Sequence, residues 1–273
     1  NNDNENAQYM LGMIYLEGIG IKRDIKKGVY YLERSAEKKY VRAQYAIGKI
    51  FYKGIYVIRD VYKSIHYFKL AAIQNHLEAL TNLGIIYFEM KDLEKSIFYL
   101  ELAAEKNEPH ALYIIGGFSL NGEYVKKDIT KGINYLTRSA SFNYPRALFL
   151  LGDLYFNGKI VPKDVDKGIR YLSIAAVHNN GDAFYFLGKI YILGIECRQN
   201  ISKAIYYLTF GSELNHTLCN FFLGTIYFSN ACVHSNIEKS IYYFKKGSSL
   251  NCAYSKNNLG IIYKNGYEIE KNI

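Results

Sequence analysis

Proline, cysteine and long hydrophobic runs are scarce in this chain of 273 residues. The 3 prolines, and the lack of a long polar stretch after the first few residues, argue against a linker and a second domain. No apolar run approaches the roughly 18 residues that a membrane helix needs, and no secretory signal core is visible. Because the chain opens with Asn1 and starts and stops beside repeated motifs, we expect it to be a segment of a longer protein.

Motifs of common catalytic and cofactor sites are absent as well. The sequence holds no HExxH, no nucleophile elbow, no phosphate-binding loop and no dinucleotide-binding glycine fingerprint. No Ser-x-x-Lys motif begins a predicted helix. We therefore predict a protein that is not an enzyme and that has no catalytic residue, no metal site and no cofactor.

Positive charge is present but is not clustered. The net charge is +9 at pH 7, and the basic residues are scattered along the chain. A nucleic-acid interface of the electrostatic kind needs a clustered basic patch. We therefore predict no nucleic-acid partner, and no membrane contact by this segment.

What the sequence does contain is a repeated motif, which first appears as Leu11-Gly12-Met13-Ile14-Tyr15. Its glycines step by 36 residues, with one step of 32, and are Gly12, Gly48, Gly84, Gly116, Gly152, Gly188, Gly224 and Gly260. A period between about 20 and 50 residues predicts stacked structural repeats. We predict a polar leader at residues 1–6 and a single solenoid at 7–273, with units starting near residues 7, 43, 79, 111, 147, 183, 219 and 255.

Each unit begins with a predicted helix, here called helix A. A small residue, an aliphatic residue and an aromatic residue follow one another at i, i+4 and i+8, which places them close to one helical stripe. Glycine inside a helix costs about 1 kcal/mol relative to alanine. The return of Gly in all eight copies therefore predicts that another helix approaches closely, and that these glycines are structural.

A second helix, helix B, follows a loop in each unit. Glycines near the predicted end of helix A fit left-handed C-caps, and they are Gly18, Gly54, Gly122, Gly158, Gly194 and Gly266, with Asn230 in the seventh unit. An N-cap residue then precedes helix B: Asp24, Asp60, Asp92, Asp128, Asp164, Asn200 or Asn236.

The 4 cysteines all follow residue 196. His216, Cys219, Cys232 and His234 could supply four zinc ligands. However, about 13 mostly helical residues separate the two pairs, which places them roughly 15–20 Å apart. A disulfide between Cys197 and Cys232 is the more favourable alternative, because both residues lie in equivalent loops of adjacent repeats, and whether it forms is left open.

The pattern of each unit closely resembles the Sel1-like repeat, a relative of the tetratricopeptide repeat. The matching segments include the Leu-Gly-Tyr helix, the loop Gly18-Ile19-Gly20, the helix start Asp24-Ile25-Lys26-Lys27-Gly28 and small pairs such as Ala71-Ala72. The resemblance covers nearly the whole chain. It implies an all-α fold, a right-handed α-α superhelix of seven complete Sel1-like helix pairs plus one terminal helix.

Two units depart from this pattern. The third lacks four loop residues, and the fourth carries Gly117 and has Ser119 at the aromatic position. A shorter loop beside an under-filled helix predicts a bend or looser packing between the third and fourth units. Neutral drift is the alternative.

Two rows of variable residues on helix A are the candidates for partner binding, because helix A lines the ligand-binding concave wall in related repeats. They are Tyr9, Met13, Tyr45, Lys49, Thr81, Ile85, Tyr113, Gly117, Phe149, Asp153, Tyr185, Lys189, Phe221 and Thr225. Tyrosine is favoured at the energetic centres of protein interfaces. The alternative is that many of these tyrosines only fill grooves between neighbouring A helices.

The resemblance implies a non-enzymatic protein-interaction scaffold or adaptor. Its best-known eukaryotic members, of the Sel1/Hrd3 type, hold a membrane ubiquitin ligase together with misfolded client proteins in the endoplasmic reticulum. That comparison favours other proteins as partners and the endoplasmic reticulum as the compartment, with the cytoplasm as the alternative. The other readings are a cytosolic or bacterial signalling scaffold and, in a different class, a β-lactam-type hydrolase of the Sel1-like family.

Overall fold

The computed structural model describes residues 4–229 and 235–265, and every regular element in these residues is an α-helix. Eight are A helices: α1 (Glu5–Glu17), α3 (Val41–Lys53), α5 (Leu77–Glu89), α7 (Pro109–Asn121), α9 (Pro145–Asn157), α11 (Gly181–Leu193), α13 (Thr217–Phe228) and α15 (Ala253–Lys264). Seven are B helices: α2 (Ile25–Glu37), α4 (Val61–Ile73), α6 (Leu93–Glu105), α8 (Ile129–Ser141), α10 (Val165–Val177), α12 (Ile201–Glu213) and α14 (Ile237–Ser249). The predicted all-α class and the order of helix pairs are confirmed.

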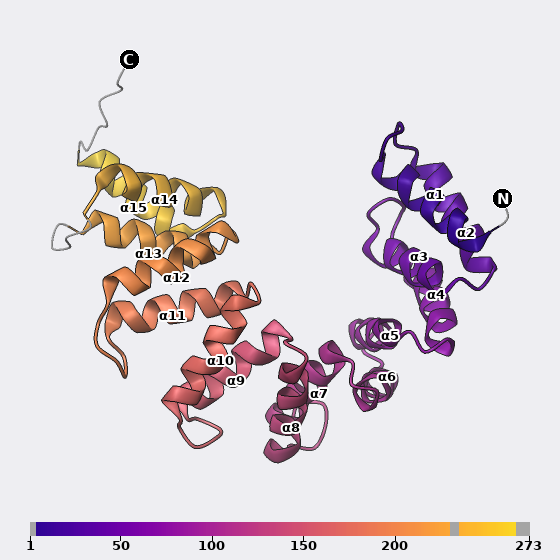
Figure 1. Ribbon diagram of the computed structural model, residues 1–273, viewed down its shortest axis with the longest axis horizontal. Helices are drawn as coiled ribbons and strands as arrows, with labels where there is room; N and C mark the ends of the chain where they lie inside the picture. Colours follow the sequence, from indigo (N-terminus) through magenta and orange to yellow (C-terminus); the bar gives the residue numbers. More distant parts are fainter. Residues whose placement is uncertain (1–3, 230–234, 266–273) are drawn as a thin grey trace. The chain divides into compact units, whose positions relative to one another are not determined.

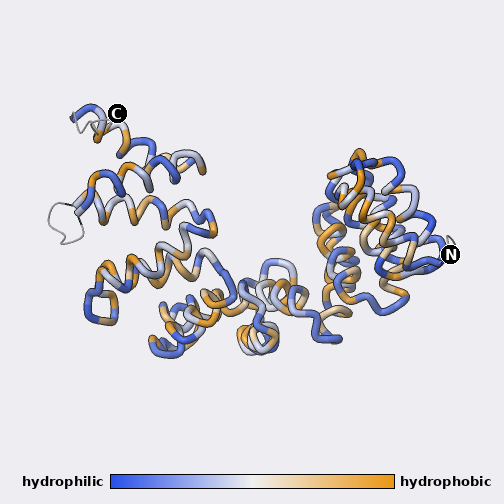
Figure 2. Tube along the Cα trace, turned by 45° about the horizontal axis from the view of Figure 1, so that its top comes forward, coloured by the Kyte–Doolittle hydropathy of each residue, from blue (hydrophilic) through white to orange (hydrophobic). Residues whose placement is uncertain are grey.

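The chain divides into two compact units, Asn1–Ser139 and Ala140–Ile273. Figure 1 labels the helices from α1 to α15. Within each unit an A helix packs on the B helix that follows it, as α1 does on α2, and B helices contact the next A helix, as α2 does α3. Figure 2 shows hydrophobic residues recurring along each helix and hydrophilic residues gathering in the loops. The continuity of one solenoid over residues 7–273 stays a prediction.

The repeated glycines lie where helix A crosses helix B. A Cβ atom added to any of the first seven would lie 2.5–3.0 Å from the side chain of a B-helix leucine or phenylalanine. In the first repeat the fit is reciprocal, because Gly12 faces Leu32 while Gly28 of α2 faces Leu16. The predicted reason for these glycines, close approach of a second helix, is confirmed. Gly260 differs, since nothing lies within 4 Å of its added Cβ.

The Asp or Asn residue before each B helix is its N-cap, as the sequence predicts. Each of the seven side chains accepts a hydrogen bond from the backbone N–H three residues later, at 2.8–3.2 Å. The backbone N–H of each cap residue also donates to the carbonyl of helix A at the aromatic position, as Asp24 does to Tyr15 at 2.9 Å. One residue therefore starts helix B and ties it to helix A.

Left-handed backbone conformations close both kinds of turn. The predicted left-handed C-caps are present at Gly18, Gly54, Gly122, Gly158 and Gly194. The other two predicted caps, Gly266 and Asn230, lie outside the described residues. The turn from helix B to the next helix A uses another residue with positive φ, at Lys39, Asn75, Asn107, Asn143, Asn179, Asn215 and Asn251. Asparagine tolerates this conformation better than most residues. This role of the turn residues is not among the sequence predictions.

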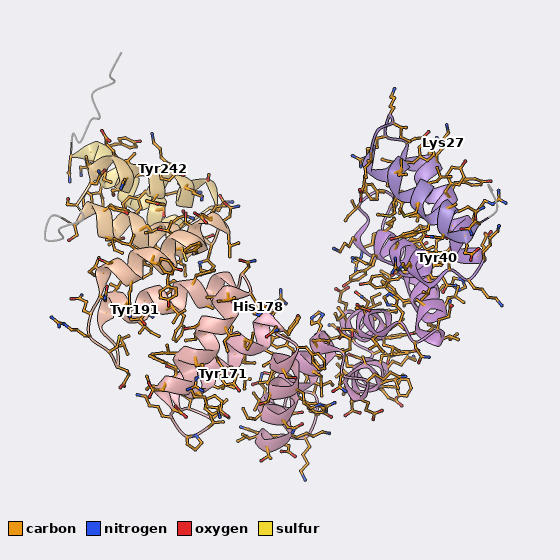
Figure 3. The ribbon with its side chains drawn as sticks, in the orientation of Figure 1. Lys27, Tyr40, Tyr171, His178, Tyr191 and Tyr242 are labelled. Carbon is orange, nitrogen blue, oxygen red and sulfur yellow. The ribbon has the colours of Figure 1, made fainter. Side chains whose placement is uncertain are left out.

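A lysine and two aromatic rings recur on the side of the helix pair near the start of helix B. In six repeats the aromatic ring of helix A stacks on a tyrosine of helix B, with centroids 5.6–6.1 Å apart. The lysine three residues after the cap lies 3.9–5.5 Å from the centroid of the helix A ring. Lys27 on α2, Tyr171 on α10 and Tyr191 on α11 are members of this set (Figure 3).

The fourth repeat lacks one ring of this set because Ser119 replaces it. Ser119 is 1% exposed and donates its hydroxyl to the Ile115 carbonyl. Lys131 then lies 5.6 Å from the ring of Tyr135 on helix B. A hollow of about 290 Å³ lies beside Ser119 and is also lined by Glu101, Val125 and Lys131.

Gly188→Ala should lower stability, because the new methyl would lie 2.6 Å from Leu208 at a tightly packed crossing. Overpacking of this kind costs about 1–3 kcal/mol. Gly260→Ala is the matched control, because its site is open and alanine favours a helix by about 1 kcal/mol. Thermal unfolding midpoints of the two variants and the parent chain test this expectation. Equal losses for the two variants would contradict the proposed role of the crossing.

Ser119→Tyr should raise stability by restoring the missing ring between Lys131 and Tyr135. An aromatic pair contributes about 0.5–1.5 kcal/mol beyond its buried area. Thermal unfolding of Ser119→Tyr measures this gain, and Ser119→Ala separates the loss of the hydroxyl from the gain of the ring. A midpoint for the tyrosine variant below that of the alanine variant would show that the site has no room for a ring.

Candidate functional site

Residues of the two candidate rows on helix A border a groove between α1 and α3, within the compact unit Asn1–Ser139. Its volume is about 340 Å³. It is lined by Tyr9, Met13, Leu16, Arg42, Tyr45, Ala46, Lys49, Ile50, Lys53, Ile55, Tyr56 and His76. Four of the predicted residues, Tyr9, Met13, Tyr45 and Lys49, thus meet at one site.

The tyrosines of this groove have a structural role as well. The ring of Tyr9 lies 5.4 Å from that of Tyr40, the N-cap residue of α3. The ring of Tyr45 stacks on His76, the N-cap residue of α5, with centroids 4.2 Å apart. Each ring therefore contacts the start of the next A helix, while both rings still line the groove. In these repeats, packing and partner binding are compatible roles for the same residues.

Positive charge follows the α3 side of the groove. Arg42, Lys49 and Lys53 are spaced by seven and four residues, which places them on one helical face. Lys49 also lies 5.4 Å from the centroid of the Tyr45 ring. None of the residues that line the groove is acidic.

His76 lies at the α5 rim of the groove, where burial and a carboxylate oppose each other. Its Nδ1 lies 3.2 Å from the Glu78 carboxylate, a contact that favours the charged ring. Burial has the larger effect and lowers the pKa of His76 below its ordinary value. The ring is therefore neutral at pH 7, and the positive charge of the groove comes from α3.

The remaining candidates of the first unit have different surroundings. Thr81 is 2% exposed and donates its hydroxyl to Glu108, so it joins α5 to the start of α7. Ile85 and Tyr113 are half-buried. Gly117 faces open space, since nothing lies within 4 Å of an added Cβ.

In the second compact unit, Ala140–Ile273, the candidate residues of the two helix A rows differ more in their chemistry. Asp153 accepts a hydrogen bond from Asn157, and burial raises the pKa of its carboxyl. The ring of Tyr185 stacks on His216, which repeats the Tyr45–His76 contact of the first unit. Phe149, Lys189 and Phe221 are half-buried and Thr225 is exposed.

Sequence reasoning missed several residues that line the groove. Arg42 and Lys53 lie outside the two chosen rows, although their spacing from Lys49 along α3 was available as a signal. His76 comes from the turn before α5, and Tyr56 from the loop after α3. No helical periodicity points to these two residues, because tertiary packing brings them to the groove.

Two nucleophilic side chains of the second compact unit, Cys219 and Ser212, serve packing. Cys219 is fully buried on α13, and burial raises the pKa of its thiol to about 12. Ser212 is 2% exposed, and its hydroxyl donates to Asn220. Lys246 donates to the Ser212 carbonyl at 2.6 Å and to its hydroxyl at 3.2 Å. This Ser–Lys contact therefore joins the last turn of α12 to α14.

The zinc and disulfide candidates fall partly on Cys232 and His234, which lie outside the described residues. Within residues 4–229 and 235–265, no group of three or more His, Cys, Asp or Glu side chains is arranged to hold a metal ion. In the same residues, no helix is both long enough and apolar enough to span a membrane.

The stability of the chain should depend on His76 in a pH range set by its lowered pKa. Protonation is less favourable in the folded state, so the neutral ring contributes stability above about pH 6.5, its ordinary pKa. That contribution is lost as the pH falls through the lower folded-state value. Thermal midpoints between about pH 7 and pH 5 should fall further for the parent chain than for His76→Gln. Parallel curves for the two proteins would contradict this expectation.

Comparison with known proteins identifies the repeat. The profile of the Sel1 repeat matches residues 6–40, 41–76, 77–108, 109–141, 145–179, 182–216, 217–252 and 253–273. These matches fall on the helix pairs α1–α2 to α13–α14 and on α15. No curated protein matches the sequence.

Three solved structures of similar proteins come from bacteria. A Sel1 repeat protein from Oxalobacter formigenes is 26% identical with a TM-score of 0.70, covering 96% of this chain and 78% of its own. PilF of Pseudomonas aeruginosa is 17% identical with a TM-score of 0.52, covering 77% and 91%. The protective antigen c5321 of uropathogenic Escherichia coli, which displays an SLR fold, is 22% identical with a TM-score of 0.49, covering 97% and 65%.

The helix pairs, their glycine crossings and the eight profile matches lead to one conclusion: this chain belongs to the Sel1 repeat family.

Proposed function

We propose that this chain is a non-catalytic scaffold that holds protein partners in the groove between α1 and α3. The observation that carries the proposal is that Tyr9, Met13, Tyr45 and Lys49 line one groove. Sel1 repeat proteins generally serve as protein-interaction scaffolds. The proposal assigns that general role to the residues that line the groove.

The chemistry of the groove suits a peptide segment. Tyrosine offers a large apolar face with a polar tip, and methionine adapts to irregular shapes. Both are held on A helices that the glycine crossings pack against their own B helices, so little ordering is required when a partner binds. Exposed Ile55 extends the apolar surface into the loop after α3.

The burial of Cys219 and Ser212 supports the scaffold over the hydrolase alternative, because a nucleophile must reach its substrate. Two narrower scaffold roles follow from the family resemblance. One is an adaptor of an endoplasmic reticulum degradation ligase, and the other is a cytosolic or bacterial signalling scaffold. The identity of the partners distinguishes them.

The first test is cross-linked affinity purification of the full-length protein from its own cells, followed by mass spectrometry. Tyr45→Ala and Ile55→Ala should reduce recovery of the partners, because both side chains line the groove. Tyr62→Ala is the control, since Tyr62 is 76% exposed on α4 and does not line this groove. A membrane ubiquitin ligase among the lost partners would support the degradation role, and cytosolic or envelope proteins would support the other.

Partners that remain bound to both groove variants, after both variants have been shown to fold, would contradict the proposal. Turnover of an ester or β-lactam by the purified chain, abolished by changing one serine or cysteine, would favour the enzyme alternative.

A further inference from the structure

We propose that the partner segment held in the α1–α3 groove is acidic, with at least one apolar or aromatic side chain. This inference rests on the proposed function and names the chemistry of its ligand. It depends on charges and contacts in the second repeat.

Arg42, Lys49 and Lys53 form a cationic stripe that the second repeat alone contains. The same three positions in the third repeat are Glu78, Ile85 and Glu89, and in the sixth they are Asp182, Lys189 and Leu193. No other repeat has more than one Lys or Arg at these positions. The stripe is therefore not part of the pattern that builds each helix pair.

Two carboxylates of the neighbouring third repeat contact groups outside the stripe. Glu78 lies beside His76, at 3.2 Å. Glu89 is bound to the Arg59 guanidinium at 2.7 Å and accepts the Tyr52 hydroxyl. Across residues 4–229 and 235–265, no carboxylate forms an ion pair with any of the three cations of the stripe. An anionic partner would supply the missing counter-charge.

The other wall of the groove is apolar. Tyr9 and Met13 come from α1, and Ile55 and Tyr56 come from the loop after α3. The Arg23 guanidinium lies 5.1 Å from the Tyr56 ring centroid, which adds a further cation at this end. A segment with carboxylates along one side and an apolar side chain on the other would match both walls.

A protein segment fits these features better than a nucleic acid. The stripe is confined to one repeat. A binding site for a polynucleotide would instead have basic residues along several repeats, beside the phosphate backbone. At the matching positions of the neighbouring third repeat the chain has Glu78 and Glu89 instead of cations, so the stripe can contact only a short ligand segment. We therefore assign the groove to an acidic peptide.

The test uses a phage-displayed library of random linear peptides selected on the immobilised chain. Selected peptides should be enriched in Asp and Glu. The best of them, made synthetically, should lose affinity with rising salt and bind Arg42→Glu/Lys53→Glu at least about tenfold more weakly, because like charges would then face each other. Both replaced residues are exposed, which keeps the fold intact.

Lys189→Glu is the control, because it also replaces a cation by a carboxylate, at the position of the sixth repeat that is equivalent to Lys49. It should leave the affinity unchanged. Selected peptides without acidic enrichment, or equal binding by Arg42→Glu/Lys53→Glu, would overturn the inference. So would an oligonucleotide of mixed sequence that competes more strongly than any selected peptide.

Ile55→Ala separates this inference from the proposed function. If non-acidic peptides are selected and Ile55→Ala weakens their binding, the groove is a peptide site and only its acidic preference is wrong. If selected peptides bind Ile55→Ala and the parent chain equally, or if no peptide is selected, both proposals fail.

Discussion

The close crossing of helix A and helix B is the contact on which the rest of each repeat depends. Gly12 and Gly28 allow the two backbones to approach, and Leu32 and Leu16 fill the space that the glycines leave. This fit is local to one helix pair and sets how the two helices cross, while stacking on neighbouring pairs completes the buried core. The exposed face of helix A is then held at a fixed position, which is the requirement for a preformed binding groove.

Local signals made most of the fold predictable from the sequence. The period of the glycines, the Asp and Asn caps and the left-handed glycines each reflect contacts within one repeat, and the structure shows these contacts at Gly188, Asp164 and Gly158. The asparagines of the turns were missed, although they recur from Asn75 to Asn251 with the period of the glycines and could therefore have been predicted from the sequence. Positions such as Cys232 lie beyond the described residues and add nothing to this comparison.

The candidate site was predictable only in part. Variation along helix A pointed to Tyr9 and Lys49, but Thr81, chosen by the same rule, is buried against Glu108. The candidates were chosen by their position along helix A alone. The groove also depends on which loops and N-cap residues lie beside that helix. His76 shows the difference, since it reaches the site from the turn before α5.

The link between the cap residue and helix A has a consequence for how such a chain can evolve. In the third repeat four loop residues are missing, yet Asp92 still caps α6 and still donates to the Tyr87 carbonyl at 2.9 Å. The length of the loop can therefore change while the packing of helix A on helix B stays the same. Insertions and deletions can accumulate in these loops and remodel the rim of a groove such as the one beside Ile55 and Tyr56, so that recognition can diversify while the framework is inherited unchanged.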